Sequence, residues 1–244
     1  MRKTNSRLSM AAYCLVSASV AALVYSPCKS LAVPPPSDND RGSFVFTIAG
    51  QQIGTESFEI RTQKGQVEAS SKVDLRVAQE GKTMDFRTTS KLTLTPDLVP
   101  QNYEWDQKGA QASKLEIDLR STPATARYRT VAGGDDVREF DLPRNVLILD
   151  SNVIHHFELA LMRFRRAGGS KQTFPAFIPQ QALPGSLSIE ETGEESVDID
   201  GKTRKLRHFV LTTENAQIDL WADGQDRLQK LSIPAARLEV IRQK

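Results

Sequence analysis

The fold is decided by residues 67–77, VEASSKVDLRV, in which small or apolar residues alternate strictly with polar ones. Val67, Val73 and Leu75 fall on one face of an extended chain, and Glu68 and Asp74 fall on the other. Strict alternation indicates a strand with one buried face and one wet face, which is typical of an antiparallel sheet. We therefore expect an antiparallel sheet to form around this strand.

The alternation continues along the chain beyond this strand. Residues 84–94 and 114–120 repeat it, and glycine-containing pairs at 64–65, 200–201 and 223–224 separate such stretches. The last two pairs are Asp-Gly, which suits type I′ hairpin turns because glycine takes positive φ without a steric cost. The spacing of these signals predicts roughly a dozen strands.

One segment, residues 151–167, has helical rather than strand periodicity, with apolar residues recurring at spacings of three and four. Asp150 or Ser151 is expected to cap its start, arginines crowd its last turn, and Gly168 and Gly169 end it. It is the single helix that the sequence of the domain predicts.

This pattern predicts a mainly β fold: an antiparallel meander that forms a strongly curved sheet or open barrel with one central α-helix. A twisted sheet of many strands cannot stay flat, and its apolar face must be buried against another part of the protein. One helix covers only a few strands, so curvature must cover the rest. We expect the helix to lie in or across the mouth of the curved sheet.

The amino end has the layout of a secretory signal peptide. Arg2 and Lys3 precede an apolar stretch over residues 10–24, and small residues at Ser30 and Ala32 form a cleavage signal. A membrane anchor is the alternative, but a span needs roughly 20 apolar residues. We therefore expect an exported protein, periplasmic or secreted, with a signal peptide over 1–32, a proline-rich linker over 33–42 and one β-rich domain over 43–244.

Export changes what the composition indicates. The whole chain has a formal net charge of +2, and the expected signal contains four basic residues and no acidic ones. The remaining chain is slightly acidic, which argues against nucleic acid as a partner. Both cysteines, Cys14 and Cys28, lie in the expected signal, so no disulfide or thiolate chemistry is expected in the domain. The alternative is a lipoprotein anchored through a lipidated Cys28.

Several stretches resemble a family of uncharacterised bacterial envelope proteins. Residues 44–46 (FVF) and 50–56 (GQQIGTE) are similar to the first hairpin of the family catalogued as domain of unknown function 3108. Residues 147–150 (LILD) before the helix and 220–224 (LWADG) before a final hairpin are also similar. The resemblance implies a curved β-sheet domain of the envelope, akin in shape to periplasmic lipid carriers. It implies no catalytic residues.

The most suggestive chemical cluster is His155, His156 and Glu158. His155 and Glu158 can share one face of the helix, as metal ligands do, but the spacing of a zinc-protease motif is absent. We expect partly exposed histidines near the helix start, no metal and no cofactor. A metal-dependent enzyme that uses these histidines is the third-ranked alternative.

The first-ranked interpretation is a non-enzymatic envelope protein that holds an apolar or lipid-like ligand in its curved sheet, because concave apolar interiors bind small molecules. A protein-protein interaction module of the cell envelope, docking through exposed strands, ranks second. The aromatic residues Trp105 and Trp221 are expected to pack in the core, although aromatics at a rim can also contact a ligand. The expected ligand-lining residues are Met84, Phe86, Leu92, Leu94, Leu115, Ile117, Leu119, Tyr103 and Trp105.

Overall fold

The structure is a computed structural model that describes residues 39–79, 82–109, 112–130, 133–150, 152–214 and 216–243. The expected signal peptide and Cys28 lie outside these residues, as does most of the expected linker. The first strand already begins at Asn39, so the last residues of the expected linker belong to the sheet.

The domain is built on one meander of strands that follow one another in chain order and pair antiparallel, except that β9 and β10 pair parallel. The first eight strands are β1 (Asn39–Ile48), β2 (Gln51–Gln63), β3 (Gln66–Gln79), β4 (Lys82–Leu94), β5 (Pro100–Lys108), β6 (Ser113–Asp118), β7 (Ala124–Thr130) and β8 (Asp135–Phe140). The others are β9 (Leu147–Ile148), β10 (Lys171–Ile178), β11 (Leu183–Ile199), β12 (Lys202–Thr212), β13 (Gln217–Ala222), β14 (Leu228–Ile233) and β15 (Leu238–Gln243). Their order in the sheet runs from β8 down to β1, then β15 down to β9.

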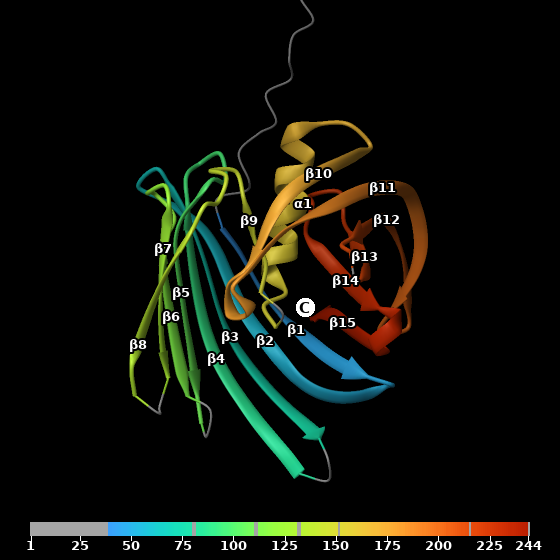
Figure 1. Ribbon diagram of the computed structural model, residues 1–244. Coiled ribbons are helices and arrows are strands. Elements are labelled where there is room, and N and C mark those ends of the chain that lie inside the picture. Colours follow the sequence, from blue (N-terminus) through green and yellow to red (C-terminus); the bar gives the residue numbers. More distant parts are fainter. Residues whose placement is uncertain are drawn as a thin grey trace, which may run out of the picture. The chain divides into compact units, whose positions relative to one another are not determined.

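The sheet is strongly curved but not closed, because β8 and β9 are its two edges. The first and last strands, β1 and β15, pair in its middle. The one α-helix, α1 (His155–Ala167), stands within the curve (Figure 1). Two short 3-10 helices, η1 (Pro179–Gln181) and η2 (Pro234–Ala236), cap hairpins. The predicted fold class is therefore confirmed, with the helix inside the sheet.

The alternation of residues 67–77 predicts the buried face of β3 correctly. Val67, Val73 and Leu75 are buried, and the polar residues between them face outward. The turn at residues 200–201 has positive φ at both positions, as expected for a type I′ turn. The turn at residues 223–224 is different, because the Asp223 carboxylate accepts backbone N–H bonds from further along a longer loop.

The start of α1 differs from the prediction. The helix begins at His155, and Ile154, not Asp150, holds the N-cap position and makes no side-chain cap bond. Ser151, the other expected cap, lies outside the described residues. The cap comes instead from β2, where Glu56 accepts the backbone N–H of Ile154 at 2.7 Å. The predicted end is correct, since Gly168 terminates the helix with a positive φ.

In the part of the chain that the structure describes, no helix is long and apolar enough to span a membrane.

Candidate functional site

The meander places alternate turns at the same end of the sheet, because consecutive antiparallel strands reverse direction. The turns after β1, β3, β5 and β7 lie at one end, which we call the lower end, as Figure 1 is drawn. The carboxyl end of α1 lies at the opposite end, where Arg163 and Arg166 donate hydrogen bonds to the carbonyls of Leu98 and Pro96 in the β4–β5 turn. The helix start therefore points toward the lower end.

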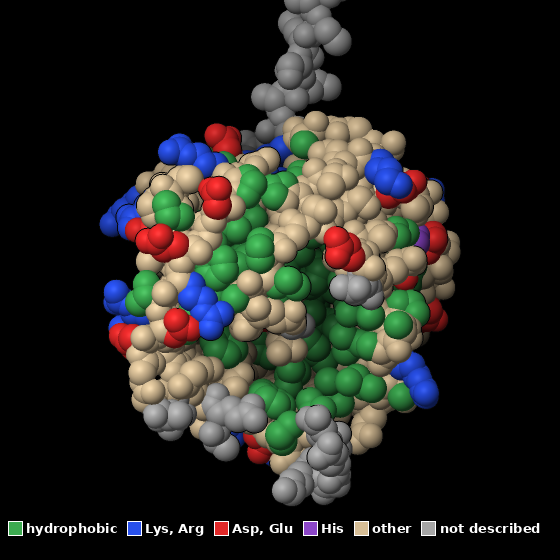
Figure 2. Space-filling view, viewed as in Figure 1, with side chains coloured by type: hydrophobic (Ala, Val, Ile, Leu, Met, Phe, Trp, Pro, Cys, Tyr) green, Lys and Arg blue, Asp and Glu red, His purple; other side chains and the backbone are tan. Residues whose placement is uncertain are grey.

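A hollow lined by hydrophobic side chains occupies the middle of the molecule in Figure 2, in front of β1 and β2. The concave face of β3 and β4 supplies apolar residues below the level of the helix start. Leu75 pairs with Phe86 and Val77 pairs with Met84 in this part of the sheet, and all but Leu75 are half-buried. The helix covers the upper part of the concave face and leaves these lower positions partly open.

A buried carboxyl and an imidazole meet where α1 begins. The Glu56 carboxyl bonds the Ile154 N–H and lies 2.7 Å from His155 Nδ1, and both side chains are fully buried. Burial raises the pKa of Glu56 to about 8 and lowers the pKa of His155 to about 3, because a low dielectric disfavours each charged form. The pair therefore carries no net charge at neutral pH.

A second buried carboxyl, Asp150, lies just before the helix. Its Oδ2 accepts the Tyr103 hydroxyl at 2.6 Å and a bond from the Gln180 amide, and its Oδ1 accepts the Asn152 N–H. Burial raises the pKa of Asp150 to about 6, partly offset by the bond from Tyr103. These bonds tie β5, η1 and the turn before α1 together.

His156 is also buried, and neither of its ring nitrogens has a hydrogen-bond partner among the residues that the structure describes. Its ring packs edge-on against Tyr103 and His155, with centroid separations of 5.6 and 4.7 Å. It borders a small cavity of about 10 Å³ whose walls include Leu92 and Leu94. That space is about the size needed for one water molecule. Burial holds the pKa of His156 well below its usual range.

A third buried carboxyl, Glu158, joins the helix to β14 and β15. Its Oε2 accepts the Leu228 N–H at 2.9 Å and an N–H of Arg242 at 3.0 Å, while the other Arg242 nitrogen bonds Asp40 at 2.7 Å. Burial and the neighbouring Asp40 carboxyl raise the pKa of Glu158 well above its usual range. His155 and Glu158 thus have separate partners, so the shared metal-ligand face considered from their spacing does not form.

The expectation of partly exposed histidines is wrong for the helix pair. His155 is 0% exposed and His156 is 1% exposed, because the helix start lies inside the curve of the sheet, where His155 stacks on Phe58 and His156 packs against Tyr103. No group of side chains suited to hold a metal ion occurs among the described residues.

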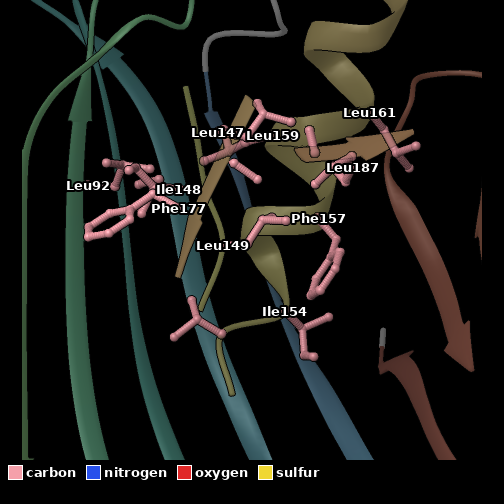
Figure 3. Close-up of a cluster of buried hydrophobic side chains, with 14 of the residues drawn as sticks. Leu92, Leu147, Ile148, Leu149, Ile154, Phe157, Leu159, Leu161, Phe177 and Leu187 are labelled. Atoms are coloured by element: carbon pink, nitrogen blue, oxygen red, sulfur yellow. The ribbon is translucent and has the colours of Figure 1, made fainter. Parts of the chain in front are cut away.

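The nine expected lining residues fall into two groups. Tyr103 and the five leucine and isoleucine residues are buried in the core, where Leu92 lies near Phe177 and Ile148 in Figure 3. Met84, Phe86 and Trp105 are half-buried on the concave face. The second group and its neighbours Leu75 and Val77 lie toward the lower ends of β3, β4 and β5.

Trp221 does not pack in the core as expected. Leu220 and Ala222 take the inward positions, so Trp221 lies half-buried on the convex face. Its ring stacks on His208 at a centroid distance of 4.9 Å, and its indole N–H bonds Glu195.

Sequence reasoning missed Glu56, the residue that fixes the helix start. The sequence feature that could have identified Glu56 is the alternation of β2. Glu56 lies two residues before the buried Phe58 and four residues before the buried Ile60, so its side chain must also point inward. A carboxyl on the apolar face of a strand needs a buried partner, and the sequence does not say where that partner lies.

The chain is similar in fold to structures of uncharacterised proteins. A crystal structure of a beta-barrel-like protein of domain of unknown function 1849 from Brucella abortus aligns over 85% of this chain and 95% of that chain, with a TM-score of 0.57 and 8% identity. A domain of unknown function 1089 family protein from Pseudomonas aeruginosa aligns over 82% and 91%, with a TM-score of 0.45 and 12% identity.

No protein-family model and no curated protein matches the chain, so membership of the domain of unknown function 3108 family is not shown. At 8% identity the first likeness shows a shared fold alone. The chain has the beta-barrel-like fold of proteins whose function is unknown.

Proposed function

We propose that the protein is a non-enzymatic binding protein that holds an apolar or lipid-like ligand in the hollow at the lower end. The observation that carries the proposal is the half-buried apolar strip on the concave face of β3, β4 and β5, which α1 leaves uncovered. Concave apolar surfaces with a few polar groups nearby are the usual form of small-molecule sites.

The packing of the interior limits where such a ligand would lie. The upper part of the concave face is filled by α1 and β9, and the cavity beside His156 is too small for an organic molecule. The ligand would therefore lie below the helix start, against Leu75, Val77, Met84, Phe86 and Trp105. The Glu56–His155 pair lies above this position. Because the pair carries no net charge, an apolar ligand would not have to displace water from a buried ion.

We propose that the protein performs this binding after export, in the periplasm or outside the cell. The support is the layout of the amino-terminal sequence, and an intact mass of the protein from its own host that begins at Val33 would agree with it. A mass that includes a lipidated Cys28 would show instead that the protein is anchored to the membrane through this residue.

Two measurements test the ligand proposal. Native mass spectrometry of protein purified from its own host should reveal a carried apolar molecule. Titration with a pyrene-labelled fatty acid should give saturable energy transfer from tryptophan. The chain has two tryptophans, so a Trp221→Phe background assigns the signal to Trp105.

The matched variants compare the concave strip with an equally apolar position elsewhere. The double change Met84→Ser with Phe86→Ser should weaken probe binding by about tenfold or more, since each removes apolar contact area. Val137→Ser should leave binding unchanged, because Val137 is 52% exposed on the convex side of β8. Absent binding, or equal loss in both variants, would remove the proposal.

A second candidate, an interaction module of the envelope, is favoured by the free edge of β8. This strand pairs on one side only, and a groove of about 430 Å³ separates it and β7 from η1. Four of its six residues are charged, and charges on an edge strand discourage strand addition. Pull-down from an envelope fraction tests it: a stoichiometric protein partner that is lost on Val137→Pro would favour this function.

A further inference from the structure

The pairing register of the sheet defines one row of side chains that crosses the concave face from β2 to β7 (Figure 1). Side chains of directly paired residues point to the same face of an antiparallel sheet, so the row can be followed from strand to strand. Its members, in order, are Glu56, Val73, Thr88, Gln107, Ser113 and Thr130. All of them except Val73 are polar, and we call this set the polar row.

The polar row lies between two parts of the surface proposed to contact the ligand. On the side toward the lower end, Leu75 pairs with Phe86. On the other side of the row, Trp105 pairs with Leu115. A ligand that contacts both Phe86 and Trp105 must therefore cross the row. Such a ligand needs hydrogen-bonding groups of its own, because a wholly apolar molecule would cover polar side chains without replacing their bonds to water.

The part of the row on β5, β6 and β7 is open to solvent. Gln107 and Ser113 are half-buried, Thr130 is exposed, and the three line a depression of about 510 Å³. Neighbouring strands lie about 4.8 Å apart, so this part of the row extends over about 10 Å. That length exceeds a single hydroxyl or carboxyl group and suits a head group with several hydroxyls.

A buried member of the row also points to a polar ligand. Thr88 is 5% exposed, and its hydroxyl has no hydrogen-bond partner among the residues that the structure describes. It lies on the concave face, next to Gln107 in the row. Buried hydroxyls without a partner are rare in proteins, and water or a bound group satisfies most of them. The Thr88 hydroxyl is therefore an independent sign that polar groups from outside the chain reach the row.

The polar row presents no free charge to a ligand. Its one carboxyl, Glu56, is fully buried and belongs to the Glu56–His155 pair, which carries no net charge at neutral pH. Alternation places the charged residues that border the depression on the convex face: Asp106, Lys108, Lys114 and Arg129. Lys114 and Arg129 are each bonded to an aspartate, at 3.2 and 3.0 Å. Hydroxyl and amide side chains both donate and accept hydrogen bonds, so they match a neutral head group that does the same.

We propose that the ligand is an amphiphile with an uncharged head group that carries several hydroxyls, as in a glycolipid. Its apolar chain lies against Met84 and Phe86, and its head group bonds Gln107, Ser113 and Thr130 along the row. A lipid with a carboxylate or phosphate head binds more weakly, because the row offers its charge no cation in exchange for water. This inference rests on the proposed ligand function and names the chemical class of the ligand.

Competition against the pyrene-labelled fatty acid tests the head group. The competitors are dodecyl maltoside, monododecanoyl glycerol and dodecanoate, each used below the concentration at which it forms micelles. Dodecyl maltoside should displace the probe at about one tenth of the dodecanoate concentration or less. Monododecanoyl glycerol that equals the maltoside would show that a short polyol is sufficient, and a weaker effect would favour a sugar head. Dodecanoate that equals or exceeds both neutral compounds would overturn the inference.

Matched variants test whether the polar row makes this selection. Ser113→Ala with Thr130→Val removes two hydroxyls from the open part of the row and should weaken displacement by dodecyl maltoside about tenfold, the effect of losing two neutral hydrogen bonds. Displacement by dodecanoate should change little. Ser57→Ala with Thr89→Val removes the same groups from exposed positions on the convex face and should alter neither competitor. An unchanged preference for the maltoside in the row variant would overturn the inference.

Probe binding separates this inference from the ligand proposal. If the unaltered protein does not bind the probe, the ligand proposal fails, and the head-group inference fails with it. If the protein binds the probe but the three competitors displace it equally, the ligand site stands and the row does not select the head group. Probe binding that persists in the row variant shows that the variant is folded, so its loss of maltoside binding reports on the row alone.

Discussion

At the scale of single residues, Glu56 shows how a buried carboxyl fixes a helix start. Local sequence offers Asp150 and Ser151 as caps, yet the N–H of Ile154 is satisfied from a strand 98 residues earlier. Unpaired N–H groups at a helix start must find acceptors when they are buried. Glu56 supplies one acceptor to Ile154 and another contact to His155, so one side chain positions both.

Glu56→Gln should change how stability depends on pH. The folded pKa of about 8 lies above the ordinary value of 4.5, so the contribution of Glu56 is fully present below pH 4.5 and is lost as pH rises through 8. In the unaltered protein this group lowers the free energy of unfolding by up to about 1.4 kcal/mol per pH unit across that window. Gln does not titrate, so the variant should lose this slope in urea unfolding measured from pH 5 to 8.

Glu116→Gln is the control for this change, because Glu116 is exposed on the outer face of β6. It should leave the pH dependence of unfolding as it is. A Glu56→Gln curve parallel to that of the unaltered protein would show that Glu56 is ionised in the folded state.

At the scale of elements, the β2–β3 pair depends on one close approach of backbones. Gly54 lies opposite Leu75, next to the irregularity in the β1–β2 register. A Cβ at Gly54 would lie 2.1 Å from the carbonyl oxygen of Asp74 and 2.8 Å from the Leu75 Cα. Backbone atoms cannot move aside as a flexible side chain can, so only glycine fits this position.

Gly54→Ala should therefore destabilise the protein by about 1–3 kcal/mol, the usual cost of overpacking a closely packed site. Chemical denaturation measures this cost. Gly185→Ala is the matched control, since a Cβ there would meet nothing within 4 Å. Equal stabilities of the two variants would show that β2 and β3 shift apart without penalty.

At the scale of the whole molecule, one buried ion cluster joins distant parts of the chain. Arg242 of β15 bonds Asp40 of β1 and Glu158 of α1, and its side chain is 9% exposed. The sheet is open between β8 and β9, so its cohesion depends on the β1–β15 pairing and on contacts to the helix inside. Arg242 makes both kinds of contact at once.

Arg242→Met should lower the free energy of unfolding by about 1–3 kcal/mol, because the buried Glu158 carboxyl loses a hydrogen-bond donor, while Asp40 keeps Arg227 at 3.8 Å. Adding Glu158→Met should recover part of the loss, since the orphaned carboxyl is then removed as well. Arg237→Met, at an exposed arginine, should cost little. Thermal or urea unfolding of these proteins and of Glu158→Met alone measures the coupling, and strictly additive losses would show that Arg242 and Glu158 act independently.

The sequence by itself determined the antiparallel strands, most of their turns, the one helix and the end of that helix. Those features depend on period-2 or helical patterning and on glycine, which act over a few residues. Only the tertiary structure decided that α1 stands inside the curve, that Glu56 caps it and that His155 and His156 are fully buried. It also decided that Trp221 faces outward and that Gln180 of η1 reaches the buried Asp150 before the helix. These outcomes depend on contacts between residues far apart in the chain, and the curvature that makes those contacts is a property of the whole sheet.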